Sequence, residues 1–189
     1  HLQIAVNQAR QLSSVITQLM DFQKVDVGRE IVSLTMTDVV KLITQRKLMA
    51  ESLAGTKGVK IHVSASPESY VTAVDESKME KVIDNLISNA VKYSHNDEEV
   101  FMEFRGEKNR WSLTVRDNGI GIGKKDQRKL FREFHRGENA INAKIVGSGI
   151  GLLMVKNYVS ILGGTISVES QENEGCLFKI VIPYRQVDV

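Results

Sequence analysis

The sequence has one cysteine, two prolines and no long hydrophobic run. Because Cys176 is alone, an internal disulfide is excluded, and this cysteine usage fits a reducing compartment. Cys176 lies in an alternating apolar stretch with no histidine nearby in sequence, which favours a small core residue over a nucleophile. No apolar run approaches the roughly 20 residues that cross a bilayer, and no signal peptide is visible. These absences predict a soluble, cytoplasmic globular chain.

A strong charge of one sign is also missing, because 25 lysines and arginines face 23 aspartates and glutamates, for a net charge of +2. A protein that binds nucleic acid or an anionic membrane needs a clustered basic surface. The densest basic run, residues 124–129, is interrupted by Asp126 and followed by Glu133. We therefore interpret this run as a solvated surface and expect no nucleic-acid partner.

Residues 1 to about 24 carry the periodicity of one long amphipathic helix, which residues 25–28 end. Its apolar residues recur at alternating steps of three and four, which is typical of a coiled coil or helical bundle. Such a helix cannot bury its apolar stripe alone and needs a partner helix, and Gly28 is a suitable end. The sequence opens inside this pattern, which suggests a piece of a longer protein. The apolar positions are Leu2, Ala5, Ala9, Leu12, Ile16 and Leu19.

From residue 29 to 189, helical and strand patterns alternate and indicate a second domain. Their number predicts an α+β sandwich, with one sheet covered by helices on one face. Helices are expected at about 38–53, 76–93 and 150–162, and strands at about 31–35, 59–65, 71–74, 100–105, 111–116, 165–169 and 176–183.

The expected helix at 76–93 has two distinct faces. At 100° per residue, an apolar face spans about 140° and a separate polar face spans about 100°. The polar face carries Asn85, Asn89, Lys92 and Tyr93. A face wetted only by solvent is the alternative, but asparagine has weaker helix propensity than residues that would serve such a face equally well. The apolar face consists of Met79, Ile83, Leu86, Ile87, Ala90 and Val91.

Two glycine runs lie next to predicted elements. The first follows a strand, and the second opens a helix. In the first, Asp117-x-Gly119-x-Gly121, the glycines permit close backbone approach, and the carboxylate can accept a hydrogen bond from an amino group such as that of adenine. A flexible surface turn is the alternative. In the second, Gly147-x-Gly149-x-Gly151, the opening helix offers backbone N–H groups to an anion such as phosphate.

Neither run is a phosphate loop of the G-x-x-x-x-G-K-[ST] type. Neither completes G-x-G-x-x-G, because Lys124 and Leu152 stand at the third glycine's place. A P-loop NTPase and a dinucleotide-dependent oxidoreductase are therefore disfavoured.

Phe131 and Phe134 lie between the glycine runs and predict the apolar face of a short helix. Residues 138–146 contain few large apolar side chains and predict an exposed, mobile lid hinged on glycine.

Taken in order, these motifs resemble the asparagine, first glycine, phenylalanine and second glycine boxes of sensor histidine kinases. The resemblance covers essentially the whole chain. Residues 1–28 look like the second helix of that family's dimerisation and histidine-phosphotransfer stem, and residues 29–189 look like its ATP-binding catalytic domain. The implied fold is the Bergerat-type α/β sandwich.

The resemblance implies a role for each polar site residue. Asn89 would coordinate Mg²⁺ through its amide oxygen, and Asn85 would contact phosphate or a metal-bound water. Lys92 would meet the phosphates of ATP, and Tyr93 would pack near the nucleoside. Asp117 would recognise the adenine amino group.

The same resemblance implies roles for the glycine runs and for the segment between them. Arg136 would reach the γ-phosphate when the lid closes. Close approach to the nucleotide and lid movement would depend on Gly119, Gly121, Gly147, Gly149 and Gly151, with Leu152 in contact with the nucleotide.

The implied reaction transfers the γ-phosphoryl of ATP to a histidine on a stem helix that this sequence lacks. His1, His62, His95 and His135 do not match an acceptor, so the chain should not phosphorylate itself. ATPases of this fold carry a glutamate four residues before the magnesium asparagine. Here Asn85 stands in that place, which favours a kinase over the alternatives, a hydrolytic ATPase or a serine kinase.

Three partners follow from the resemblance: a stem helix with the acceptor histidine, a response-regulator receiver domain and a second copy of the parent protein. The parent is expected to be anchored in a membrane. A non-enzymatic ATP-binding or dimerisation module is a further hypothesis.

Overall fold

The computed structural model describes residues 13, 16, 20, 31–132, 135, 137–142, 145 and 147–186. Within the predicted opening helix, Ser13, Ile16 and Met20 have helical conformation. The rest of that helix and the predicted domain boundary after residue 28 lie outside the described residues. No helix in the described part of the chain is long and apolar enough to cross a bilayer.

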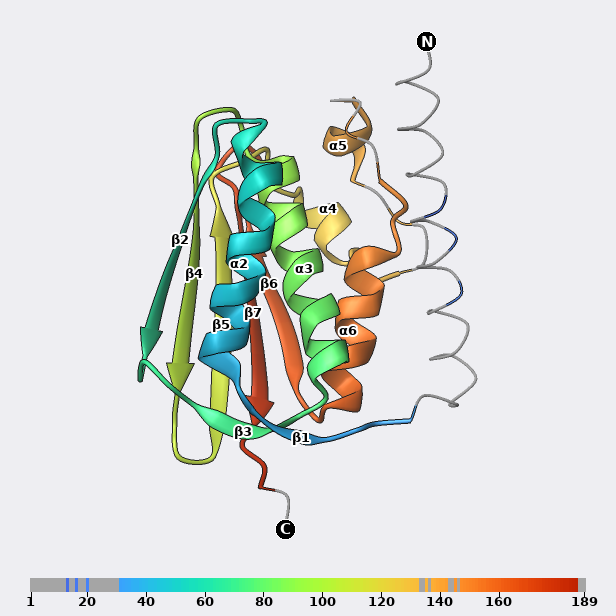
Figure 1. Cartoon of the computed structure of the whole chain (residues 1–189). Coiled ribbons are helices and arrows are strands. Elements are labelled where there is room, and N and C mark those ends of the chain that lie inside the picture. The colour runs from blue at the N-terminus through green and yellow to red at the C-terminus, as the bar shows by residue number, and fades with distance from the viewer. Residues whose placement is uncertain are drawn as a thin grey trace.

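One layer of the fold is a five-stranded mixed sheet in the order β2-β4-β5-β7-β6 (Figure 1). The first pair, β2 and β4, is parallel, and the other neighbours are antiparallel. A separate antiparallel ribbon joins β1 to β3. The strands are β1 (Thr35–Asp38), β2 (Lys60–Ser66), β3 (Val71–Val74), β4 (Glu99–Gly106), β5 (Arg110–Asp117), β6 (Thr165–Ser170) and β7 (Cys176–Pro183).

The second layer consists of helices α2 (Val39–Gly55), α3 (Glu76–Tyr93) and α6 (Gly151–Ile161), which cover one face of the sheet (Figure 1). Two short helices, α4 (Lys124–Gln127) and α5 (Glu138–Asn142), lie between β5 and α6 in the chain. The predicted α+β sandwich with helices on one face is therefore confirmed.

The core between the layers follows the period of each element. On β4 and β5 alternate side chains are buried, as a strand with one covered face requires. On α3 the predicted apolar face is confirmed, since its six residues are all almost fully buried. Each large apolar side chain buried in this way stabilises the fold by about 1.5–3 kcal/mol. The covered strand residues are Val100, Met102 and Phe104 of β4 and Trp111, Leu113 and Val115 of β5.

Helix α2 begins where the sequence predicts. The Asp38 carboxylate caps it by accepting hydrogen bonds from the backbone N–H groups of Val40 and Lys41. The same side chain also accepts from Ser69 Oγ and from the backbone of Tyr70, which ties the helix start to the turn before β3.

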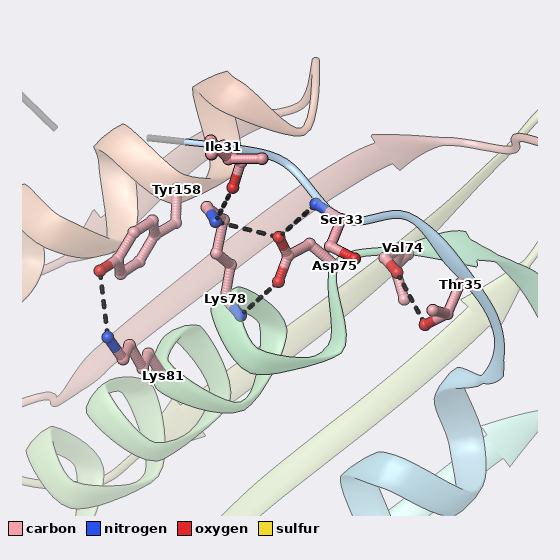
Figure 2. Close-up of polar contacts among 8 residues, drawn as sticks. All are labelled: Ile31, Ser33, Thr35, Val74, Asp75, Lys78, Lys81 and Tyr158. Atoms are coloured by element: carbon pink, nitrogen blue, oxygen red, sulfur yellow. Dashed lines mark hydrogen bonds and ion pairs between the residues drawn. The ribbon is translucent and has the colours of Figure 1, made fainter. Parts of the chain in front are cut away.

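The strand predicted over residues 31–35 is wrong, because β1 begins only at Thr35. The backbone groups of the preceding residues are bonded to side chains instead of to a neighbouring strand. The carbonyl of Ile31 accepts from Lys78 Nζ at 2.9 Å, and the N–H of Ser33 donates to Asp75 Oδ2 at 3.0 Å (Figure 2).

One expectation for the segment between the glycine runs is also corrected. Residues 128–132 form turns and a bend rather than a helix, and Phe134 lies outside the described residues. Residues 138–142 of the predicted lid form helix α5, on which Glu138, Ile141 and Asn142 are exposed and only Ala140 is buried. The small side chain of Ala140 gave no apolar signal in the sequence.

Asp75 and Lys78 form a buried ion pair at the start of α3, with 4% and 8% of their surfaces exposed. Lys78 Nζ lies 2.9 Å from Asp75 Oδ2, and the other carboxylate oxygen accepts from the backbone N–H of Lys78 (Figure 2). Burial alone would raise the pKa of Asp75, but the hydrogen bonds from Ser33 and Lys78 outweigh it and lower that pKa. Asp75 thus caps α3, and the two side chains of the pair bind the backbone of residues 31–33, which precede β1.

We predict that Lys78→Met lowers the free energy of unfolding by about 3 kcal/mol, because it leaves the Asp75 charge buried without its partner. Urea denaturation followed by circular dichroism measures this loss. The matched control is Lys41→Met on the exposed side of α2, which should change stability far less. Equal losses in the two variants would contradict the assignment of a stabilising role to the pair.

Candidate functional site

Residues from five separate segments meet in one cavity of about 420 Å³. The walls come from α3, the end of β5 with the loop that follows it, the segment from the end of α4 through α5, the segment that leads into α6, and the start of β7. Asn89 and Asp117, which the sequence analysis assigned to opposite ends of one ligand, both line it. The other predicted site residues in the walls are Asn85, Lys92, Tyr93, Gly121, Gly147, Gly149, Gly151 and Leu152.

Asp117 ends β5 at the inner wall, with only 3% of its surface exposed. Its Oδ1 accepts a hydrogen bond of 2.9 Å from the backbone N–H of Gly119. Burial raises the pKa of the carboxyl to about 6, against the opposing effect of hydrogen bonds from the backbone of Gly119 and Cys176. A buried carboxylate of this kind favours a ligand that brings a hydrogen-bond donor, such as an amino group.

Cys176 contributes to the same wall but has no nucleophilic character. Burial and the neighbouring Asp117 charge raise the pKa of its thiol to about 12. Its Sγ lies 3.2 Å from Ser170 Oγ. The prediction of a small core residue is therefore confirmed, because a thiol that stays protonated is a poor nucleophile.

Asn85 and Asn89 present amide groups one helical turn apart on α3. Asn85 Nδ2 donates to the carbonyl of Lys81 at 2.8 Å, which directs Oδ1 toward the start of α6. A Cβ placed on Gly151 would lie 2.6 Å from that oxygen. The half-buried amide of Asn89 makes no hydrogen bond with any residue that the structure describes.

These amides fit a cation that is shared with a ligand. Within the described residues, no three histidine, cysteine, aspartate or glutamate side chains gather into a metal site. A cation in this cavity would depend on amide oxygens, ligand oxygens and water. Mg²⁺ suits such a set, because it prefers oxygen, keeps several waters and binds phosphate oxygens of substrates.

Lys92 and the start of α6 make the opposite wall suitable for an anion. Lys92 Nζ lies 4.7 Å from the centre of the Tyr93 ring, and a Cβ on Gly147 would lie 2.6 Å from the same nitrogen. No side chain caps α6, and its first turn has no acidic residue. Its first N–H groups and helix dipole therefore favour phosphate.

The first glycine run is needed for contacts within the protein as well as near a ligand. A Cβ on Gly119 would overlap the carbonyl oxygen of Tyr93, and one on Gly121 would overlap the carbonyl oxygen of Gln171. Gly121 also has a φ of 62°. Gly119 is not among the lining residues, because it packs against the end of α3 behind the cavity wall.

Several residues of the site were missed by sequence reasoning. Asn139 on α5 lines the cavity and donates through Nδ2 to the carbonyl of Gly121 at 2.7 Å. Gln127 Nε2 donates to the carbonyls of Ile122 and Ser170, both at 2.7 Å, and so joins the loop to β6. These residues lie in polar stretches without periodicity. Arg136, which was predicted to reach the γ-phosphate, lies outside the described residues.

Comparison with known proteins identifies relatives over most of this architecture. The family model described as histidine kinase-, DNA gyrase B-, and HSP90-like ATPase matches residues 74–186. The signal transduction histidine-protein kinase BarA of Escherichia coli (strain K12) is 30% identical over 94% of this chain and 20% of its own length. The sensor protein kinase WalK of Staphylococcus saprophyticus is 34% identical over 94% of this chain and 28% of its own length. The chain thus spans less than a third of these two relatives.

Solved structures share the fold. Full-length ShkA in complex with AMPPNP superimposes with a TM-score of 0.84 at 21% identity, over 97% of this chain and 38% of its own. The histidine kinase AdeS of Acinetobacter baumannii has a TM-score of 0.79 at 23% identity, over 96% of this chain and 82% of its own.

We predict that burial of Asp117 makes the ligand-free protein less stable as the pH rises. A carboxyl whose folded pKa lies above its unfolded value of 3.8 supports folding below that value, and this support is lost as the pH rises through about 6. Relative to Asp117→Asn, the free energy of unfolding of the wild type should fall by about 3 kcal/mol between acidic and neutral pH. Urea denaturation of both proteins across this range measures the difference. A difference that stays constant with pH would contradict the assigned environment of Asp117.

Proposed function

Because this chain belongs to the histidine kinase-, DNA gyrase B- and HSP90-like ATPase family, we propose that it is the ATP-binding catalytic domain of a sensor histidine kinase. It would transfer the γ-phosphoryl of ATP to a histidine on a separate stem helix. The observation that carries the proposal is the single cavity lined by the buried Asp117 carboxylate and by the Asn89 amide, which no described residue satisfies.

The adenine end of ATP fits the wall formed by Asp117. The exocyclic amino group of adenine would donate to the carboxylate, which burial has deprived of water. Apolar side chains around it would sandwich the purine ring, and guanine, with a carbonyl oxygen in place of this amino group, would face the carboxylate with an acceptor. The neighbouring apolar lining residues are Ile120, Ile122, Leu130 and Phe178.

The phosphate end fits the wall formed by Lys92 and the uncapped start of α6. Asn89 would hold Mg²⁺ through its amide oxygen, with Asn85 in contact with a phosphate or a metal-bound water. When bound, Mg²⁺ would neutralise charge on the phosphate oxygens during transfer. AMPPNP in the ShkA structure supports a nucleotide as the ligand of this fold.

Catalysis by these residues would consist of positioning and charge neutralisation. A neutral imidazole nitrogen is already a nucleophile, so the reaction needs no protein base to activate it. Asn85 supports this assignment, because its amide cannot take a proton from water at neutral pH, as a hydrolytic ATPase would require.

The wider assembly is proposed from the relatives. We infer that residues 1–28 form the second stem helix and residues 29–189 the catalytic domain. The stem would bring the acceptor histidine, a second copy of the protein and the receiver domain of a response regulator to this unit. The domain would work in the cytoplasm, attached to a membrane-anchored parent. Sensor kinases among the relatives support this arrangement.

We predict that Asp117→Ala weakens ATP binding about 100-fold, because a buried charged acceptor is lost. Isothermal titration measures the affinity, with GTP as a second ligand that the wild type should reject. Full ATP affinity in Asp117→Ala would remove the adenine assignment.

Asn89→Ala should instead remove most of the increase in ATP affinity that Mg²⁺ gives, measured with and without EDTA. Exposed-site controls for both variants are Glu51→Ala and Asn109→Ala.

We predict phosphoryl transfer in trans. Incubation with γ-labelled ATP, Mg²⁺ and a separate stem that bears the acceptor histidine should label the stem with acid-labile, base-stable phosphate. The chain alone should remain unlabelled, and Asn89→Ala should abolish labelling of the stem. ATP consumption without a labelled stem would favour the hydrolytic alternative.

A further inference from the structure

Lys57, in the turn between α2 and β2, holds the end of the helix that carries the polar site residues. Its Nζ donates to the carbonyl oxygens of Val91 at 3.1 Å, Lys92 at 3.0 Å and Ser94 at 2.6 Å. An ammonium has three N–H donors, and here all three have carbonyl acceptors. Lys57 is therefore engaged by the protein and has no donor left for a phosphate.

These bonds complete the end of α3. The last four carbonyls of a helix have no partner within it. The first, that of Ala90, accepts from the N–H and hydroxyl of Ser94. Lys57 binds those of Val91 and Lys92, and the N–H of Ile120 donates to that of Tyr93 at 3.1 Å.

The same few residues of α3 contact both glycine runs. The Tyr93 carbonyl lies between the Lys92 and Ser94 carbonyls that Lys57 binds. It accepts a hydrogen bond from the loop after Asp117, and Gly119 packs against it without room for a Cβ. The Lys92 side chain extends to Gly147 at the other wall. A rotation of the last turn of α3 would therefore move the adenine wall and the phosphate wall together.

The turn around Lys57 is itself fixed by the chain that leaves α3. The Lys57 carbonyl accepts from the N–H of Asp97 at 2.9 Å. Gly58 has a φ of 70°, and a Cβ there would overlap Asp97 Oδ1. The lysine thus stands on a backbone whose conformation leaves little freedom.

We propose that Lys57 is a positioning residue for the nucleotide, acting as a built-in monovalent cation at the carboxyl end of α3. Its charge complements the negative end of the helix dipole. Its three hydrogen bonds fix the last turn of α3, and this turn positions Lys92 and the Asp117 loop for contact with ATP. This inference rests on the proposed ATP-binding function.

The test is the ATP affinity of Lys57→Ala with and without a small cation. The variant leaves three carbonyls around a space that ammonium or potassium can enter. In tetramethylammonium chloride, whose ion is too large and has no N–H, we expect ATP binding about tenfold weaker than in the wild type. Ammonium chloride at the same ionic strength should restore most of this loss.

Two matched proteins make the result specific. The wild type and Lys41→Ala, which alters an exposed lysine of α2, should bind ATP equally in both salts. General weakening of the fold would lower affinity in either salt alike, so only rescue by the small cation identifies the carbonyl site. Affinity of Lys57→Ala that equals the wild type, or a loss without rescue, would overturn the proposal.

Failure of the proposed function gives a different result, because the wild type itself would then bind no ATP. If Lys57→Ala does not fold, the ammonium of Lys57 can be followed by ¹⁵N NMR in the wild type. Three bonds to carbonyls should slow its proton exchange enough to give a signal, and ATP should shift it. A Lys57 ammonium that exchanges rapidly, or that does not respond to bound ATP, would overturn the proposal.

Discussion

The site depends on the burial of one face of α3. Because Met79, Ile83 and Leu86 are packed into the core, the helix cannot rotate about its axis without exposing them. The residues on its other face are consequently fixed in direction. Asn85 and Asn89 face the cavity for this reason, and Asn85 is oriented further by its hydrogen bond to the Lys81 carbonyl on the same helix. Hydrophobic packing thus supplies the preorganisation that the polar groups need.

Sequence reasoning succeeded where a period was strong. Helix 76–93 and strand 176–183 have the predicted bounds, because each carries apolar residues at the spacing of its element. It failed over residues 31–35, where the decisive partners, Asp75 and Lys78, lie more than 40 residues away in the chain. From the sequence alone, a short apolar run of this kind predicts a strand, because the distant side chains that bind its backbone cannot be identified.

The candidate site divides in the same way. Residues that belong to an ordered motif could be predicted, and the cavity brings most of them together. Asn139, Gln127 and Lys57 could not, since each acts through backbone carbonyls of segments distant in sequence. A carbonyl acceptor is present in every residue and leaves no mark in the sequence. Supporting contacts of this type become visible only when the fold is known.

The glycines of the first run are required by packing within the protein, independently of any ligand. Glycine at positions 119 and 121 is required by carbonyl oxygens of Tyr93 and Gln171, so the loop is seated against protein whether or not a nucleotide is present. That seating carries the Asp117 carboxylate into a place where its charge is disfavoured, as its raised pKa indicates. A ligand amino group would provide the partner that water no longer supplies. Recognition of adenine would thus compensate the free-energy cost of burying this carboxylate. Without a ligand that cost remains, and it would lower the stability of the domain.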